Sequence, residues 1–381
     1  MSTATLPLMN ESFSSGYPTR TQIISSGIPI HLVIHAVISF IIASIGIIAN
    51  GIVIVVILRS RKLRTMNTFM LFCNLAIADF LLSVTIPFNG AIMLNQGYFY
   101  YGPFLCKALP VLQTTVIIVS GLTIYITSID RSLAVAKPYF FEHWVDNKAI
   151  GIAIGLTWIV GFAFAAPQLH YLILTPLNYC YIAMVPLTAI IYQIVGIVMQ
   201  FMLPLFGGIA SYIIVNRVFH KFNSLPYHLQ PDQNQLLKAK RRANTVLTVL
   251  IVYIGCSLGF SALSIAEVAL RSRFKADRQL HFIMYNLLFA FRMVAYSSSV
   301  WNPFIYAVSS QSFRQSLYAI GRASSVGTTP FKSTSSISRD SIGHIHLKRR
   351  DYFTAKSLAP PSNSIATSTI SSDRQKEEKE N

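Results

Sequence analysis

Charged side chains are scarce in this sequence. Asp, Glu, Lys and Arg together make up 12% of its 381 residues, whereas hydrophobic residues make up 53%. Soluble domains carry roughly 25% charged residues. The composition therefore excludes an intrinsically disordered chain and argues against a soluble globular enzyme. Together with a mean hydropathy of +0.51, it indicates a membrane protein.

Acidic residues and cysteines are few. The 14 acidic residues face 31 lysines and arginines, which gives a net charge of +17. Nucleic-acid-binding proteins are often basic, but they are rarely so hydrophobic, so we expect a membrane partner and no nucleic acid. The cysteines (Cys73, Cys106, Cys180 and Cys256) are too scattered for a disulfide scaffold or a zinc site and allow at most two bridges. Without paired carboxylates, a nucleophile motif or histidines at ligand spacing, we expect neither an enzyme nor a metal site.

Seven segments are long and apolar enough to cross a bilayer, which takes roughly 20 mostly apolar residues in a helix. They are Ile30–Leu58, Met66–Leu94, Pro103–Ala136, Lys148–Leu172, Val185–Phe219, Arg241–Leu270 and His281–Val308. Residues 1–30 lack the pattern of a cleavable signal peptide. We therefore expect the first helix to act as its own insertion signal, and residues 30–308 to form the membrane domain.

Basic residues predict the orientation of the chain. They cluster after the first span and between the fifth and sixth spans, on one side of the membrane, which the positive-inside rule makes cytoplasmic. The N-terminal segment 1–29 is then extracellular, and Asn10 begins a glycosylation sequon on that side. One loop runs against the rule, with Arg271, Arg273, Lys275 and Arg278 between the sixth and seventh spans.

The region after the seventh span divides into two parts. Residues 309–321 have an amphipathic pattern, with Phe313 and Leu317 on one face, and predict a helix at the lipid surface. Residues 322–381 are rich in Ser, Thr and Lys and read as a disordered cytoplasmic tail. Its hydroxyl clusters are candidate sites for receptor kinases, whose phosphates would recruit an arrestin.

Ionisable residues inside the spans are the strongest functional signal in the chain, because they are costly in a bilayer. Asp79 lies in the middle of the second span, and Asn50, Ser120, Ser298 and Asn302 occur at comparable depth in other spans. A protonated or hydrogen-bonded packing role is the alternative for Asp79. Asp130 and Arg131 end the third span, where interfacial snorkelling would also explain them.

In their order along the chain, these residues resemble the motifs of the rhodopsin-like (class A) G-protein-coupled receptors, from Ile30 to about Ile320. The shared positions are Asn50, Leu75–Asp79, Cys106, Asp130–Ser132, Trp158, Pro204, Tyr212 and Asn302–Tyr306. The resemblance implies an all-α fold, with a seven-transmembrane helix bundle followed by a short amphipathic eighth helix. It also implies a multi-pass protein of the plasma membrane that signals through heterotrimeric G-proteins.

The resemblance carries specific roles onto this sequence. Cys106 would form a disulfide with Cys180, and Asp79 with Ser120 would hold a structural sodium ion. We expect no cofactor beyond this ion. The residues for activation and G-protein coupling would be Asp130, Arg131, Tyr212, Asn302, Pro303 and Tyr306.

Within the family, the chain looks like a receptor for neuropeptides of the neuropeptide Y and F type. Thr85–Pro87 and Cys106–Gln113 are similar to the corresponding segments of those receptors. Gln113 cannot pair with an amine as an aspartate would, and no lysine lies in the seventh span for retinal. The candidate ligand-binding residues are Gln113, Glu267 and Arg292. Two charge signals disagree: the basic outer loop and Arg292 favour an acidic ligand, whereas Glu267 would suit a cationic, amidated one.

The sixth span departs from the family pattern. Ser257 and Gly259 stand where the family usually has tryptophan and proline, so the aromatic switch and the proline kink are both missing. Ser298 likewise replaces an asparagine near the sodium site. Two alternatives stay open: a chemosensory or lipid-ligand receptor of the same family, and a seven-span transporter or channel that moves ions past Asp79.

Overall fold

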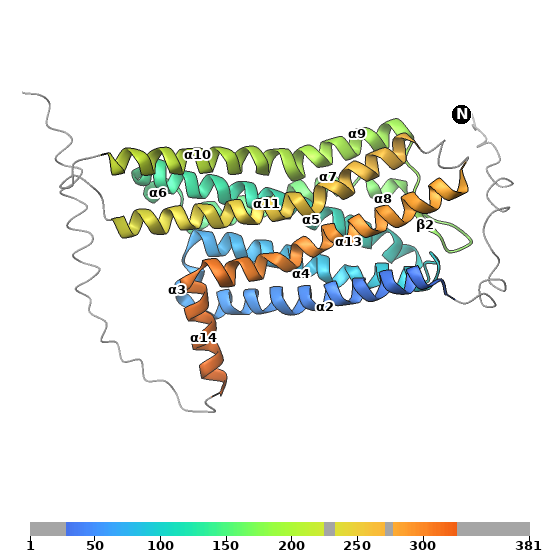
Figure 1. Ribbon diagram of the computed structural model, residues 1–381, viewed down its shortest axis with the longest axis horizontal. Coiled ribbons are helices and arrows are strands. Elements are labelled where there is room, and N and C mark those ends of the chain that lie inside the picture. The colour runs from blue at the N-terminus through green and yellow to red at the C-terminus, as the bar shows by residue number, and fades with distance from the viewer. Residues whose placement is uncertain (1–27, 225–232, 271–276, 326–381) are drawn as a thin grey trace, which may run out of the picture. The chain divides into compact units, whose positions relative to one another are not determined.

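The computed structural model describes residues 28–224, 233–270 and 277–325. Seven long helical segments run through this part of the chain, and Figure 1 shows how they are arranged. Six of them are α2 (Ile30–Arg59), α4 (Asn67–Leu94), α5 (Gly102–Ala136), α7 (Asn147–Ala165), α11 (Gln233–Ala269) and α13 (Arg278–Ser309). The remaining segment, fifth along the chain, consists of three helices without a break: α9 (Pro186–Ile197), η1 (Val198–Met202) and α10 (Leu203–Asn223). The predicted seven-helix bundle is confirmed. Three predicted features lie outside the described residues: the sequon at Asn10, the loop cations Arg271, Arg273 and Lys275, and the tail beyond Ser325. The predicted start of the disordered tail at residue 322 is wrong, because the helix α14 (Gln311–Ser325) continues to Ser325.

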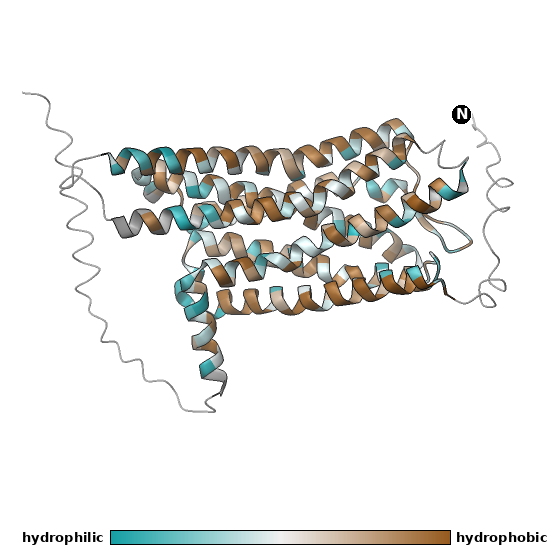
Figure 2. Cartoon of the chain, in the orientation of Figure 1, coloured by the Kyte–Doolittle hydropathy of each residue, from teal (hydrophilic) through white to brown (hydrophobic). Residues whose placement is uncertain are grey.

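Helix α5 lies at the centre of the bundle. It packs against α4, α7, α10 and α11, while α2 packs against α4 and α13, and α13 also contacts α11. Figure 2 shows hydrophobic residues along most of α2, and its outward side chains such as Ile48 and Ile52 are exposed, as a lipid-facing surface requires. The polar side chains Asn50, Asp79 and Ser120 are buried instead. The sequence therefore places its polar groups inside the bundle and its apolar ones against lipid.

Six of the described helical segments are long and apolar enough to cross a membrane; α13 falls short of that apolarity despite its 32 residues. Its polar side chains explain the difference, because Arg292, Ser298 and Asn302 all face a cavity or a buried partner. A membrane helix that lines a polar interior cannot be apolar on every side.

A two-stranded hairpin adds a small β element to a fold predicted as all-α. β1 (Leu172–Leu174) pairs antiparallel with β2 (Cys180–Ile182), and the Cys106–Cys180 disulfide joins β2 to the start of α5. Helix α7 ends at Ala165, before Pro167, which begins the short helix α8 (Gln168–Tyr171). Pro167 thus interrupts the helix of the fourth span, which continues as α8 to Tyr171 before the chain enters the hairpin. We call this part of the bundle the disulfide end.

A π-helical turn brings the fifth span close to α5. Pro204 has no N–H to donate to the carbonyl of Gln200, one turn earlier, and η1 lies at this point of the helix. The Gln200 carbonyl faces Gly121 of α5, where an added Cβ would lie 2.9 Å from its oxygen. Only glycine permits this approach of the two backbones.

The opposite end of the bundle, the arginine end, holds Arg131, the short helices α3 (Arg61–Arg64) and α6 (Pro138–Trp144), and α14 (Gln311–Ser325). α14 is amphipathic, as the sequence predicts. Phe313 is 2% exposed and packs with Leu317 into the core cluster that contains Tyr306. The Arg314 guanidinium donates to the carbonyls of Ala307 and Val308, which fixes the turn between α13 and α14.

Candidate functional site

A cavity of about 580 Å³ opens within the bundle at the disulfide end. This volume lies within the roughly 300–1,000 Å³ typical of ligand pockets. Side chains from α4, α5, α11 and α13 form its walls, and the hairpin contributes Cys180, Tyr181 and Ile182. The disulfide therefore holds β2 at the edge of the cavity.

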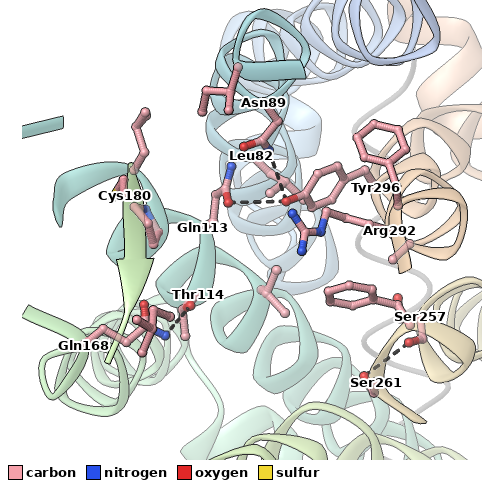
Figure 3. A pocket seen from close by; sticks show the side chains of 18 of the residues that line it. Leu82, Asn89, Gln113, Thr114, Gln168, Cys180, Ser257, Ser261, Arg292 and Tyr296 are labelled. Atoms are coloured by element: carbon pink, nitrogen blue, oxygen red, sulfur yellow. Dashed lines mark hydrogen bonds between the residues drawn. The ribbon is translucent and has the colours of Figure 1, made fainter. Parts of the chain in front are cut away.

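Neutral hydrogen bonds cross the cavity from α4 to α13 (Figure 3). The Asn89 amide donates to the Tyr296 hydroxyl at 3.3 Å, and that hydroxyl donates to Gln113 Oε1 at 3.3 Å. Gln113 Nε2 donates in turn to Thr85 Oγ1 at 3.0 Å. Because an amide NH₂ has two hydrogens, Gln113 keeps one donor for a ligand.

A second group of hydrogen bonds braces the wall at α8. Gln168 is 5% exposed, and its Nε2 donates to Thr114 Oγ1 at 2.8 Å and to the Tyr192 hydroxyl at 3.0 Å. Tyr192 donates to the carbonyl of Phe164 at 2.9 Å. These bonds join α5, α7, α8 and α9, so they hold the wall in place before any ligand arrives.

Arg292 projects from α13 toward the same region as Tyr296, four residues later on the helix (Figure 3). Its Cζ lies 5.2 Å from the centroid of the Phe260 ring, a cation–π geometry. Glu267, the other predicted charged contact, is partly buried on α11 but is not among the described residues that line the cavity.

Asp79 lies at the far end of this cavity and is 4% exposed. Its Oδ2 accepts a hydrogen bond from Asn302 Nδ2 at 2.7 Å, and its Oδ1 one from Ser120 at 3.5 Å. Asn50 and Ser298 have other partners: Asn50 donates to the Ser299 carbonyl and Ser298 to that of Ala295. Of the four residues expected to converge on Asp79, two therefore hydrogen-bond to its carboxylate.

The oxygens at Asp79 are of the kind that hard cations prefer. The carboxylate faces the cavity, its Oδ1 is held only by the long Ser120 bond, and Ser298 also lines the wall. Hard cations prefer such carboxylate and hydroxyl oxygens. The described residues contain no cluster of three or more His, Cys, Asp or Glu that could hold a metal.

Ser257 of α11 is part of the cavity wall. It lines the wall together with Ser261 and is 4% exposed. Its Cβ carries one hydroxyl where the family pattern has an indole, and the ring of Phe291 fills the space beside Gly259. The wall of this one cavity includes both Arg292 and Asp79.

At the arginine end, Arg131 pairs with the carboxylate of its neighbour Asp130. Both are buried, at 7% and 2% exposure, and this is the one ion pair among the described residues. Tyr306 is fully buried and stacks on Phe72, with ring centroids 4.3 Å apart, while Tyr212 is 42% exposed. The structure thus keeps Arg131 on Asp130 and brings it to neither tyrosine. Pro303 is buried beside Asn302 within α13.

The sequence reasoning missed Asn89, Gln168 and Tyr296 as parts of the site. Tyr296 was recoverable, because residues four apart share a helix face and Arg292 had already been identified. Asn89 and Gln168 gave no comparable signal, since their partners lie in other helices.

Comparison with known proteins gives a consistent result. Residues 49–306 match the family model described as "7 transmembrane receptor (rhodopsin family)". The chain is 24% identical to somatostatin receptor type 5 of Rattus norvegicus over 83% of its own length and 86% of that protein's. It is also 24% identical to human neuropeptide Y receptor type 2, over 73% of each chain. With the human substance-K receptor it shares 25% identity, over 71% of its length and 68% of that protein's.

Proposed function

The chain belongs to the rhodopsin family of seven-transmembrane receptors, and from that premise we propose that it is a neuropeptide-activated receptor of the plasma membrane that signals through heterotrimeric G-proteins. The main observation in support is that one bundle holds a ligand-sized cavity at one end and the buried Asp130–Arg131 pair at the other. The relatives named for peptides support the choice of ligand class. Among the described residues of the cavity wall, the one carboxylate is Asp79, which is hydrogen-bonded to Asn302 and Ser120, so an amine ligand would have no other acidic partner there.

Activation would work as a shift between two arrangements of the bundle. A ligand shifts such an equilibrium only by its difference in affinity for the two states. The cavity is lined by α4, α5, α11 and α13, so a ligand there contacts helices that also reach the arginine end. In the active arrangement Arg131 would leave Asp130 and contact the G-protein with Tyr212, and Tyr306 with Asn302 and Pro303 would reposition the end of α13.

Asp79 and Ser120 would hold a sodium ion in the inactive arrangement. The ion would supply a positive charge to a carboxylate that the bundle otherwise buries with hydrogen bonds alone. We further propose an extracellular N-terminus with a glycan at Asn10, a cytoplasmic tail for receptor kinases and an arrestin, and lipid contact along α14. The basic residues Arg61, Lys62 and Arg64 of α3 support the orientation, because they lie at the arginine end.

The proposal is tested in cells that report calcium and cyclic AMP. The full chain is expressed and challenged with a library of amidated and acidic neuropeptides, beside a no-ligand control. We expect a saturable response to at least one peptide, which Arg131→Ala abolishes at equal surface expression. Silence toward every peptide at good surface expression would contradict the proposal and favour a chemosensory or lipid ligand.

A further inference from the structure

We propose that the ligand of this receptor carries a carboxylate, from an acidic side chain or a free chain end, that binds Arg292 inside the cavity. The inference rests on the proposed function, because it names the chemistry of the ligand that the cavity takes. It also decides between the two charge signals of the sequence in favour of an acidic ligand.

The first argument is the charge distribution of the cavity wall. Among the described residues that line it, Arg292 is the one cation and Asp79 the one acid. Asp79 bonds to Asn302, ten positions after Arg292 on α13, which is about 15 Å further along a helix. The two charges therefore belong to different ends of the cavity, and Asp79 does not neutralise Arg292.

The second argument is that Arg292 has no acidic partner among the residues that the structure describes. No described carboxylate lies within salt-bridge distance of its guanidinium, since the one ion pair there is Arg131–Asp130. The ring of Phe260 lies against the guanidinium, but a cation–π contact leaves the N–H groups at its edge free to donate. A guanidinium inside a membrane bundle is costly without a counter-charge, and a carboxylate from the ligand would provide it.

The third argument is the neutrality of the surrounding groups. Asn89, Tyr296, Gln113 and Thr85 are already hydrogen-bonded to one another. They are fixed in position and carry no charge that would compete for Arg292. A cationic ligand end would meet uncompensated repulsion at this point, and Glu267, which could have attracted it, lies outside the wall.

The test uses pairs of peptides on the full-length receptor. Each activating peptide is made with its carboxylates intact and with one of them converted to an amide, at an acidic side chain or at the chain end. Removing the carboxylate that matters should raise the EC50 at least about 10-fold, as expected for a lost charged hydrogen bond. The position of that amide identifies the source of the carboxylate.

Receptor variants show whether Arg292 is its partner. Arg292→Gln should raise the EC50 of the acid peptide at least about 10-fold and that of the amide peptide by less than about 3-fold. The receptor substitution and the amidation of the peptide remove the same interaction, so their effects should not add. Arg292→Lys should retain part of the response, since it keeps the charge but loses the planar fork. Lys107→Gln is the matched control: Lys107 is exposed on α5 at the same end of the bundle but does not line the cavity. Equal potency of acid and amide forms, or an equal effect of Arg292→Gln on both, would overturn the inference.

A binding measurement separates this inference from the proposed function. The thermal midpoint of unfolding of the purified full-length chain is measured with 3-phenylpropanoate and, separately, with the uncharged 3-phenylpropanamide. If 3-phenylpropanoate raises the midpoint, 3-phenylpropanamide does not, and the increase is absent in Arg292→Gln, the carboxylate site is supported even when no peptide activates the receptor. In that case only the peptide function fails. If peptides do activate but the acid has no advantage over the amide in either assay, the function stands and the carboxylate site is refuted.

Discussion

Single side chains in this receptor have roles that depend on their partners. Gln113 was expected to bind ligand, yet both ends of its amide are engaged, with Thr85 and Tyr296. It therefore also orients the wall, while Arg292 keeps its charge available. Asp79 and Asp130 illustrate the same contrast, since one is held by neutral donors and the other by an arginine.

The Asp130–Arg131 pair should restrain the receptor when no ligand is bound. Asp130→Asn removes the charge that holds Arg131, and no other described acid pairs with it. We expect ligand-independent signalling to rise several-fold at equal surface expression, measured with the same calcium and cyclic AMP reporters. Asp146→Asn is the control, because Asp146 only caps α7 through Ala149 and asparagine caps equally well. Unchanged basal signalling in Asp130→Asn would show that the pair does not hold the inactive state.

The sodium proposal at Asp79 predicts a salt-specific stability. Sodium chloride should raise the thermal midpoint of the purified receptor by a few degrees over N-methylglucamine chloride at equal ionic strength, because binding stabilises the folded state by RT ln(1 + [L]/Kd). Asp79→Asn should abolish the difference. Ser83→Ala should keep it, because Ser83 is buried one turn away but bonds only within its own helix. A sodium effect that survives in Asp79→Asn would place the ion elsewhere.

Helices in this bundle approach one another where glycine allows it. Gly121 faces the Gln200 carbonyl of η1, and Gly161 of α7 faces α5. In a membrane, packing and not hydrophobicity drives helix association. Small residues at these contacts therefore determine how closely the walls of the cavity come together.

Gly161 provides a test with an internal control. A Cβ there would lie 2.9 Å from the Thr115 carbonyl oxygen and 3.0 Å from Val119 Cγ2. Gly161→Leu should therefore cost about 1–3 kcal/mol through overpacking and lower the apparent thermal midpoint by several degrees. Gly155→Leu, on the same helix, should have little effect because no described atom beyond its chain neighbours and the local helix backbone lies within 4 Å of its Cβ position. Similar losses in the two variants would show that α7 does not pack on α5 at this site.

The molecule as a whole combines a polar interior with an apolar exterior and a strong positive charge. The net charge of +17 includes basic residues near the arginine end, such as Arg59 and Arg61. The positive-inside rule predicts that this end is cytoplasmic. The cavity at the disulfide end would then open to the outside, where an oxidised cysteine pair is stable.

This orientation predicts a glycan at Asn10. Glycosidase treatment should shift the electrophoretic mobility of the wild-type receptor from mammalian cells, and Asn10→Gln should abolish the shift. An antibody to an N-terminal tag should bind intact cells, whereas an antibody to a C-terminal tag should need permeabilised ones. The reverse labelling would overturn the topology.

By itself, the sequence determined where the seven spans lie, although α13 is less apolar than the other six. It also determined the amphipathic helix α14 and the residues with functional potential. These depend on local properties, since a run of apolar residues partitions into lipid wherever it lies in the chain.

The tertiary structure alone decided which of these residues meet. Asp79 and Asn302 are 223 positions apart, and Gln113 and Tyr296 are 183 apart. It also placed Arg292 in the cavity wall and left Glu267 out of it. A span that is apolar on most sides does not specify its own rotation in lipid, so the inward face of each helix is fixed only when its neighbours pack against it.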